Sequence, residues 1–103
     1  MSPELRSLVD VNRLIHEPSR STILAVLAVV QSADFLYLQR ETGLTKGNLS
    51  VHLSKLEEAG LIKIEKTYRG KIPLTLCRIT VEGRKAFDTY RNQLKLFVEN
   101  TKE

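Results

Sequence analysis

The sequence contains little of what stabilises or targets many small proteins, with one cysteine, three prolines and no tryptophan in 103 residues. The single cysteine, Cys77, excludes an internal disulfide framework and fits a reducing cytosol. The longest apolar run, residues 23–30, is far shorter than the roughly 20 residues that span a bilayer. The N-terminus also lacks the basic, apolar and cleavage regions of a secretion signal. These absences predict a cytoplasmic protein without a membrane segment.

Patterns for catalysis and metal binding are absent as well. The sequence has no glycine-rich phosphate loop and no zinc-binding spacing. One cysteine and two distant histidines do not favour a soft-metal site within one chain, although a site shared between subunits stays open. We interpret His16, beside Pro18, as a local structural contact, and Cys77 as a small buried residue with a redox sensor as the alternative. No enzymatic activity, metal or cofactor is expected.

The composition is that of one globular domain covering residues 1–103, with 42% hydrophobic and 27% charged residues and a net charge of +4. The charge is uneven, because residues 44–71 contain three anions and six cations: Lys46, Lys55, Lys63, Lys66, Arg69 and Lys71. A net +3 in this part of the chain favours a polyanionic partner, and an ordinary solvated surface is the alternative.

Residues 42–62 form the most informative segment, which is typical of one amphipathic helix. Thr45 is a suitable N-cap, and Gly60 can adopt the left-handed conformation that ends a helix. Leu49, Leu53 and Leu56 recur at helical spacing and predict a buried face. The opposite face is small, hydrogen-bonding and basic, which suits close approach to base edges and phosphates; it contains Gly47, Asn48, Ser50, Val51, Ser54 and Lys55.

Three helices are expected before this segment. Residues 5–15 contain an imperfect apolar stripe, and residues 19–30 are apolar on most sides, which predicts a central, buried helix. A turn is expected at residues 32–34, followed by a helix at Phe35–Thr42 with Phe35, Leu36 and Leu38 facing inward. Gly43 should end that helix, so that the next two elements form a helix-turn-helix.

A hairpin and a last helix are expected after Gly60. Alternating residues at 62–68 and 74–79 predict two strands around a basic reversal at residues 69–71. Thr80 is expected to cap a helix of about 19 residues, which would be roughly 28 Å long. That length exceeds what a domain of this size easily covers.

This order of elements resembles the winged-helix DNA-binding domain. Residues 15–24 and 45–62 are similar to segments of ArsR-like regulators, and residues 79–83 to a segment of MarR-like regulators. The resemblance implies an α+β, mostly helical fold: a winged helix-turn-helix with a two-stranded β-hairpin wing and flanking N- and C-terminal helices. Its parts would be a helix-turn-helix at about 35–60, a wing at about 61–79 and a C-terminal dimerisation helix at about 80–99.

The same resemblance implies a sequence-specific, double-stranded DNA-binding transcription regulator. The 45–59 helix would enter the major groove with Thr45, Lys46, Asn48, Ser50, Val51, His52, Ser54 and Lys55. The wing would contact the minor groove or its backbone with Lys66, Arg69 and Lys71. Asn48 could bind adenine through two hydrogen bonds. For His52, at the edge of the leucine face, core packing and DNA contact both stay open.

Apolar stripes on the first and last helices favour a homodimer, formed by Leu5, Leu8, Phe87, Tyr90, Leu94 and Phe97. Many ArsR regulators sense metals through paired cysteines in the helix before the recognition helix, and Phe35–Thr42 has none, so a metal response is not expected. Two alternatives remain: a winged-helix protein-interaction module and a non-specific DNA-architectural protein. The sequence identifies no small-molecule effector.

Overall fold

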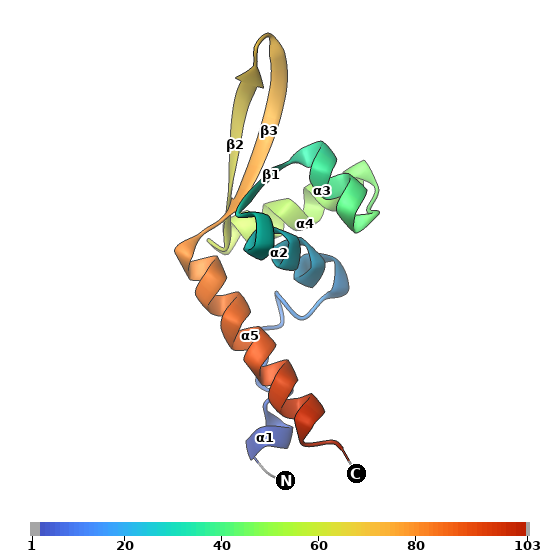
Figure 1. The fold of residues 1–103 in the computed structure, drawn as a ribbon, viewed down its shortest axis with the longest axis vertical. Helices are drawn as coiled ribbons and strands as arrows, with labels where there is room; N and C mark the ends of the chain where they lie inside the picture. Colours follow the sequence, from blue (N-terminus) through green and yellow to red (C-terminus); the bar gives the residue numbers. More distant parts are fainter. Residues whose placement is uncertain (1–2, 103) are drawn as a thin grey trace.

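The computed structural model describes residues 3–102, which form five helices and one three-stranded antiparallel sheet (Figure 1). The molecule is elongated, with extents of 57 × 25 × 20 Å. The hairpin of β2 and β3 lies at one end, and α1 lies beside the distal half of α5 at the other (Figure 1). The elements in chain order are α1 (Pro3–Arg6), α2 (Pro18–Val30), β1 (Ser32–Asp34), α3 (Phe35–Thr42), α4 (Lys46–Glu58), β2 (Ile62–Arg69), β3 (Ile72–Ile79) and α5 (Val81–Glu99).

Helix α2 is central, as predicted. Ile23, Leu24 and Leu27 are completely buried and pack in the same core as the leucines of α4. The first turn of α2 is capped by Glu17, whose carboxylate accepts hydrogen bonds from the backbone N–H groups of Ser19 at 3.0 Å and Arg20 at 2.9 Å. Carboxylates are favourable at this position because the first amides of a helix have no partner within it.

The predicted helix-turn-helix is confirmed in α3 and α4. Gly43 ends α3 in the left-handed conformation, and the Thr45 hydroxyl accepts from the Asn48 N–H at 3.2 Å to cap α4. Leu49, Leu53 and Leu56 are buried. The expectation that Leu36 faces inward is wrong, because 71% of it is exposed. Helical positions i and i+3 share a face, so burying Leu38 together with the half-buried Phe35 turns Leu36 outward.

The end of α4 has the geometry of a Schellman motif, with Gly60 at φ +77°. The Leu61 N–H donates to Leu56 O at 3.0 Å, and the Gly60 N–H donates to Glu57 O at 2.9 Å. These two bonds satisfy carbonyls that would otherwise lack partners and turn the chain directly into β2.

The hairpin is confirmed, and the sheet has one strand more than predicted. In the register of β2 and β3, Arg69 faces Ile72, so that Gly70 and Lys71 form the reversal. The turn expected at residues 32–34 is instead the short strand β1, which pairs with β3 over three positions. A strand of three residues is too short to show alternation, and its partner lies more than forty residues later in the chain. Only tertiary pairing therefore reveals it.

The prediction of a helix at residues 5–15 is wrong. Helix α1 ends at Arg6 and is followed by turns and irregular chain up to α2. The Asn12 side chain accepts from the N–H groups of Leu14 at 2.9 Å and Ile15 at 3.2 Å. Such local side-chain bonds compete with a helix for the same donors. The apolar residues there still pack, because Val11 and Ile15 belong to the core.

Helix α5 begins where predicted, with the Thr80 hydroxyl accepting from the Gly83 N–H at 2.9 Å. Phe87 and Tyr90 are buried against the core, and the half of the helix beyond them extends away from it with α1 alongside (Figure 1). Within residues 3–102, no helix combines the length and apolarity needed to cross a bilayer.

Candidate nucleic-acid interface

Helix α4 presents the predicted polar face to solvent. Burial of Leu49, Leu53 and Leu56 fixes the rotation of the helix about its axis, and 52% of Val51 is exposed on the opposite side. The remaining residues of that exposed face are Lys46, Asn48, Ser50, Ser54 and Lys55. The face thus offers amide, hydroxyl and ammonium groups on a helical surface.

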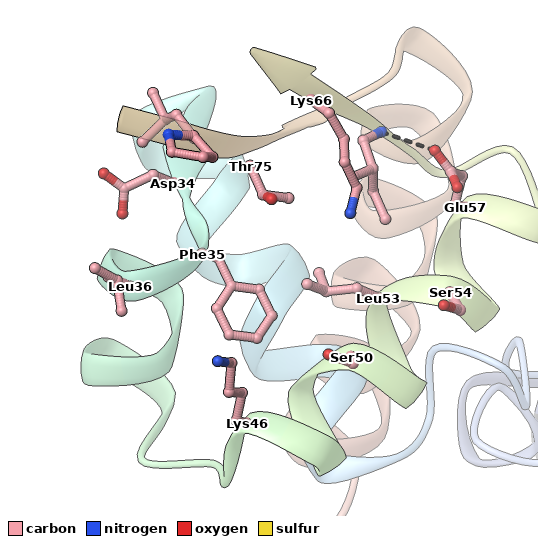
Figure 2. Close-up of a pocket in the computed structure, with 13 residues that line it drawn as sticks. Asp34, Phe35, Leu36, Lys46, Ser50, Leu53, Ser54, Glu57, Lys66 and Thr75 are labelled. Atoms are coloured by element: carbon pink, nitrogen blue, oxygen red, sulfur yellow. Dashed lines mark hydrogen bonds between the residues drawn. The ribbon is translucent and has the colours of Figure 1, made fainter. Parts of the chain in front are cut away.

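A hollow of about 580 Å³ lies between this face, the start of α3 and the wing, and its charged lining residues are Asp34, Glu57, Lys46 and Lys66. Figure 2 shows Lys46, Ser50 and Ser54 of α4 on one side of it and Lys66 of β2 on the other. The Glu57 carboxylate accepts from the Ile64 N–H at 2.9 Å and joins the end of α4 to the base of the wing (Figure 2). The two elements that the sequence associates with nucleic acid therefore border one continuous hollow.

The wing extends away from the body as two strands of eight residues each (Figure 1). Lys66, Arg69 and Lys71 are exposed, and none of the six cations between residues 46 and 71 forms an ion pair with any residue in the described range 3–102. Tyr68 and Ile72 near the tip are 69% and 68% exposed and are not among the contacts predicted from the sequence. Tyr68 lies in the predicted strand at 62–68, whereas Ile72 lies outside both predicted strands.

Two of the predicted DNA-contacting residues have structural partners. Thr45 holds the first turn of α4. His52 is half-buried against the start of α2, with its Nδ1 3.1 Å from Arg20 Nη1 and 3.6 Å from Glu17 Oε2. Arg20 Nε donates to Leu14 O at 2.5 Å, so the guanidinium is held from two sides. DNA contact by Thr45 and His52 stays a prediction, and both side chains also have a role in folding.

Glu17 is the centre of this contact. Burial raises the pKa of its carboxyl group, but hydrogen bonds from the N–H groups of Ser19 and Arg20 and the nearby charges of His52 and Arg20 lower it. The net pKa is below the ordinary value of a glutamate. Folding therefore favours the ionised carboxylate at this position.

The residues predicted for dimerisation fall into two groups. Phe87 and Tyr90 are buried in the core of the chain, whereas the others are half-buried along α1, the chain after it and the distal half of α5: Leu5, Leu8, Leu94 and Phe97. Val9 and Val98, which are 61% and 58% exposed, lie in the same two segments. An apolar surface is thus available near the two chain ends.

Cys77 is completely buried in β3, as expected for a small core residue. Burial, with smaller effects from Glu57 and Asp34, raises the pKa of its thiol to about 11. A protonated, buried thiol is a poor nucleophile, which disfavours the redox-sensor alternative. His16 is bonded through Nδ1 to the Tyr90 hydroxyl at 2.9 Å. The described residues contain no group of three or more His, Cys, Asp or Glu side chains placed to hold a metal ion.

Comparison with known proteins agrees with this geometry. The family model described as a winged helix DNA-binding domain matches residues 20–98. An uncharacterized protein of Methanocaldococcus jannaschii is 38% identical over 79 residues, which are 76% of this chain and 85% of that protein. The structure of a transcriptional regulator homologue from Pyrococcus horikoshii OT3 superposes with a TM-score of 0.89 at 27% identity, covering 99% of this chain and 100% of that one.

A MarR family transcriptional regulator from Silicibacter pomeroyi has the same fold at lower identity. Its TM-score is 0.68 at 18% identity, and the match covers 94% of this chain and 63% of that one.

Proposed function

We propose that this chain, which belongs to the winged helix DNA-binding domain family, is a homodimeric transcription regulator. The dimer would bind a two-fold-symmetric site in double-stranded DNA. The resemblance to small MarR- and ArsR-like regulators and the winged-helix fold are both confirmed. Proteins of this family regulate transcription and are not enzymes. The sequence specificity, the dimer and the contacting residues are the proposed part.

The observation that carries the proposal is the shared hollow between α4 and the wing. The exposed face of α4 has small polar side chains and no long acidic ones up to Lys55. A B-DNA major groove is about 12 Å wide and accepts such a helix. With α4 in the groove, Asn48 would hydrogen-bond adenine, and Lys46 and Lys55 would bind guanine or phosphate.

The wing would contact the neighbouring part of the duplex. A strand of eight residues spans about 26 Å, which is enough for the tip to reach beyond the groove that α4 occupies. Arg69 and Lys71 at the tip would then enter the minor groove or bind its phosphates. Lys66, nearer the hollow, would contact the backbone between the two sites.

A second copy of the chain would cover the apolar surface near the chain ends. Leu94, Phe97 and Val98 of α5, together with Leu8 and Val9, provide that surface, while Phe87 and Tyr90 support it from the core of each protomer. A two-fold dimer places the two recognition helices about 34 Å apart, which is one turn of DNA.

The test is selection of bound sequences from a random duplex pool at about 150 mM salt, paired with analytical ultracentrifugation of the free protein. We expect a dimer and a pseudo-palindromic motif with half-sites about 10 base pairs apart. A monomer at tens of micromolar would contradict the dimer. Binding only at low salt without an enriched motif would favour non-specific architecture, and no DNA binding at all would favour a protein-interaction module.

A further inference from the structure

The proposed recognition helix, α4, and the last helix, α5, meet at one corner of the fold. The Thr80 N–H donates to Leu61 O at 3.0 Å, and the Thr80 hydroxyl donates to Gly60 O at 2.7 Å. The same hydroxyl accepts from the Gly83 N–H at 2.9 Å. One side chain therefore joins the C-terminal turn of α4 to the N-terminal turn of α5. We call Gly60, Leu61, Thr80 and Gly83 the corner.

Gly83 allows the backbones of the corner to touch. A β-carbon added at this buried position would lie 1.9 Å from Leu61 O, 2.8 Å from Leu61 C and 3.1 Å from Ile79 Cγ1. Its φ is not positive, so the glycine is needed for space and not for conformation. The two nearest of these atoms belong to the backbone of a turn closed by its own hydrogen bonds, so they cannot rotate away as a side chain would.

Helix α5 has a second attachment seven residues further on. The Tyr90 hydroxyl lies 2.9 Å from His16 Nδ1 and 3.3 Å from Ser21 Oγ, and its ring is buried beside Phe87. Gly83 and Tyr90 are about 10 Å apart along the helix axis, at 1.5 Å per residue. Two fixed points along a helix determine the direction of its axis.

We propose that the corner sets the distance and angle between the recognition helix and the dimer-forming part of α5, and thereby the half-site spacing that the dimer accepts. This inference rests on the proposed function, because it needs a dimer that binds two half-sites. Gly83 and Thr80 are positioning residues here and need not contact DNA themselves.

The geometry predicts the size of the effect. An added methyl group at Gly83 must move from 1.9 Å to at least 3.0 Å from Leu61 O. A shift of about 1 Å over the 10 Å between the two attachments tilts α5 by about 6°. Over roughly 17 Å, half the separation of two recognition helices, this tilt moves each α4 by about 2 Å. The two helices together are displaced by about one base-pair step of 3.4 Å.

The experiment measures binding of the full chain to a series of duplexes that contain the two half-sites selected by the wild-type protein. The spacing between the half-sites varies from two base pairs shorter to two base pairs longer than in the selected site. Gly83→Ala is compared with Thr80→Val, which removes the hydroxyl, and Thr80→Ser, which keeps it. Thr89→Val on the exposed side of α5 is the matched control. Dimerisation and affinity for a single half-site are measured in parallel, because a loss of folding would lower both.

We expect wild type, Thr80→Ser and Thr89→Val to prefer the same spacing and to lose about tenfold in affinity one base pair away from it, because one base pair turns a half-site by about a tenth of a helical turn. Gly83→Ala should bind more weakly at the wild-type spacing and rank the other spacings differently, while remaining a dimer with the same half-site affinity. Thr80→Val should flatten the dependence on spacing. If Gly83→Ala does not fold, the comparison of Thr80→Val with Thr80→Ser tests the role of the corner.

Two different failures are distinguishable. A wild-type protein that binds no duplex, or binds without preference for spacing, refutes the proposed function before any variant is considered. A wild-type protein with a sharp optimum that Gly83→Ala and Thr80→Val both share refutes the role of the corner and leaves the proposed function intact.

Discussion

Replacing Arg69 by alanine should change how salt affects DNA binding. Arg69 ends β2 at the wing tip, is exposed, and has no ion-pair partner within residues 3–102. Its guanidinium is therefore free to neutralise a phosphate. Each neutralised phosphate contributes about 0.9 to the slope of log affinity against log salt. The proposed dimer contains two Arg69 side chains, so Arg69→Ala should reduce the magnitude of the slope by about 1.8.

That change in slope has a visible consequence. Between 50 and 200 mM salt the logarithm of concentration changes by about 0.6, so the affinity ratio of wild type to Arg69→Ala should shrink by roughly tenfold. The variant is much weaker at low salt and approaches wild type at high salt. A residue that acted only through folding would lower affinity by a similar factor at every salt concentration.

Fluorescence anisotropy with the selected duplex and a scrambled duplex of equal length provides the measurement. Arg91→Ala removes the same charge and serves as the control, because Arg91 is exposed on α5, a helix that runs away from the wing (Figure 1). We expect the Arg69 effect on both duplexes and no slope change for the control. An unchanged slope for Arg69→Ala, or an effect confined to the selected duplex, would refute phosphate contact by this side chain.

Further predictions concern base recognition, the core, the buried thiol and acid sensitivity. Asn48→Ala should cost about 1–3 kcal/mol on the selected site and relax base choice at one position per half-site, measured by repeated selection. Leu53→Ala should lower the free energy of unfolding in urea by about 2–5 kcal/mol, because it leaves a cavity at a buried position. Cys77, with a thiol pKa raised to about 11, should react with a disulfide reagent only as fast as the protein opens. Glu17 stabilises the fold through a lowered pKa, so its contribution is complete above the ordinary carboxyl pKa and is lost as pH falls through the lowered value. Glu17→Gln should therefore destabilise the protein at pH 7 and much less at pH 3, measured by urea unfolding.

Each of these predictions has an outcome that contradicts it. Equal losses for Asn48→Ala on selected and scrambled DNA would remove its role in base recognition. An unfolding free energy within 0.5 kcal/mol of wild type for Leu53→Ala, the range usual for surface substitutions, would contradict its burial. Rapid reaction of Cys77 without denaturant would restore the redox alternative. A Glu17→Gln defect of the same size at both pH values would show that the carboxylate charge is not what stabilises the start of α2.

Several elements were predictable because their signals are local. The leucines of α4 repeat at helical spacing, Thr45 and Gly60 mark its ends, and residues 62–68 and 74–79 of the wing alternate in sequence. The exposed side of α4 follows directly, because burying one face of a helix exposes the other. That is why the residues proposed for base contact could be named without a structure.

Other features depended on partners distant in the chain. Val11 and Ile15 of the 5–15 segment belong to the core, and the Asn12 side chain accepts from the N–H groups of Leu14 and Ile15 in competition with a helix. Strand β1 exists because β3 is beside it. His52 and Tyr90 have partners 32 and 74 residues earlier in the chain, and neither pairing has a sequence pattern.

The sequence by itself determined the succession of α2, α3, α4, the wing and α5, the buried face of α4 and the concentration of positive charge around it, because these depend on the spacing and chemistry of neighbouring residues. The tertiary structure decided how α4, the wing and α5 are oriented relative to one another. That orientation depends on contacts such as Thr80 with Gly60 and Gly83 against Leu61. Their geometry arises only when segments about twenty residues apart are packed together, so no local pattern encodes it.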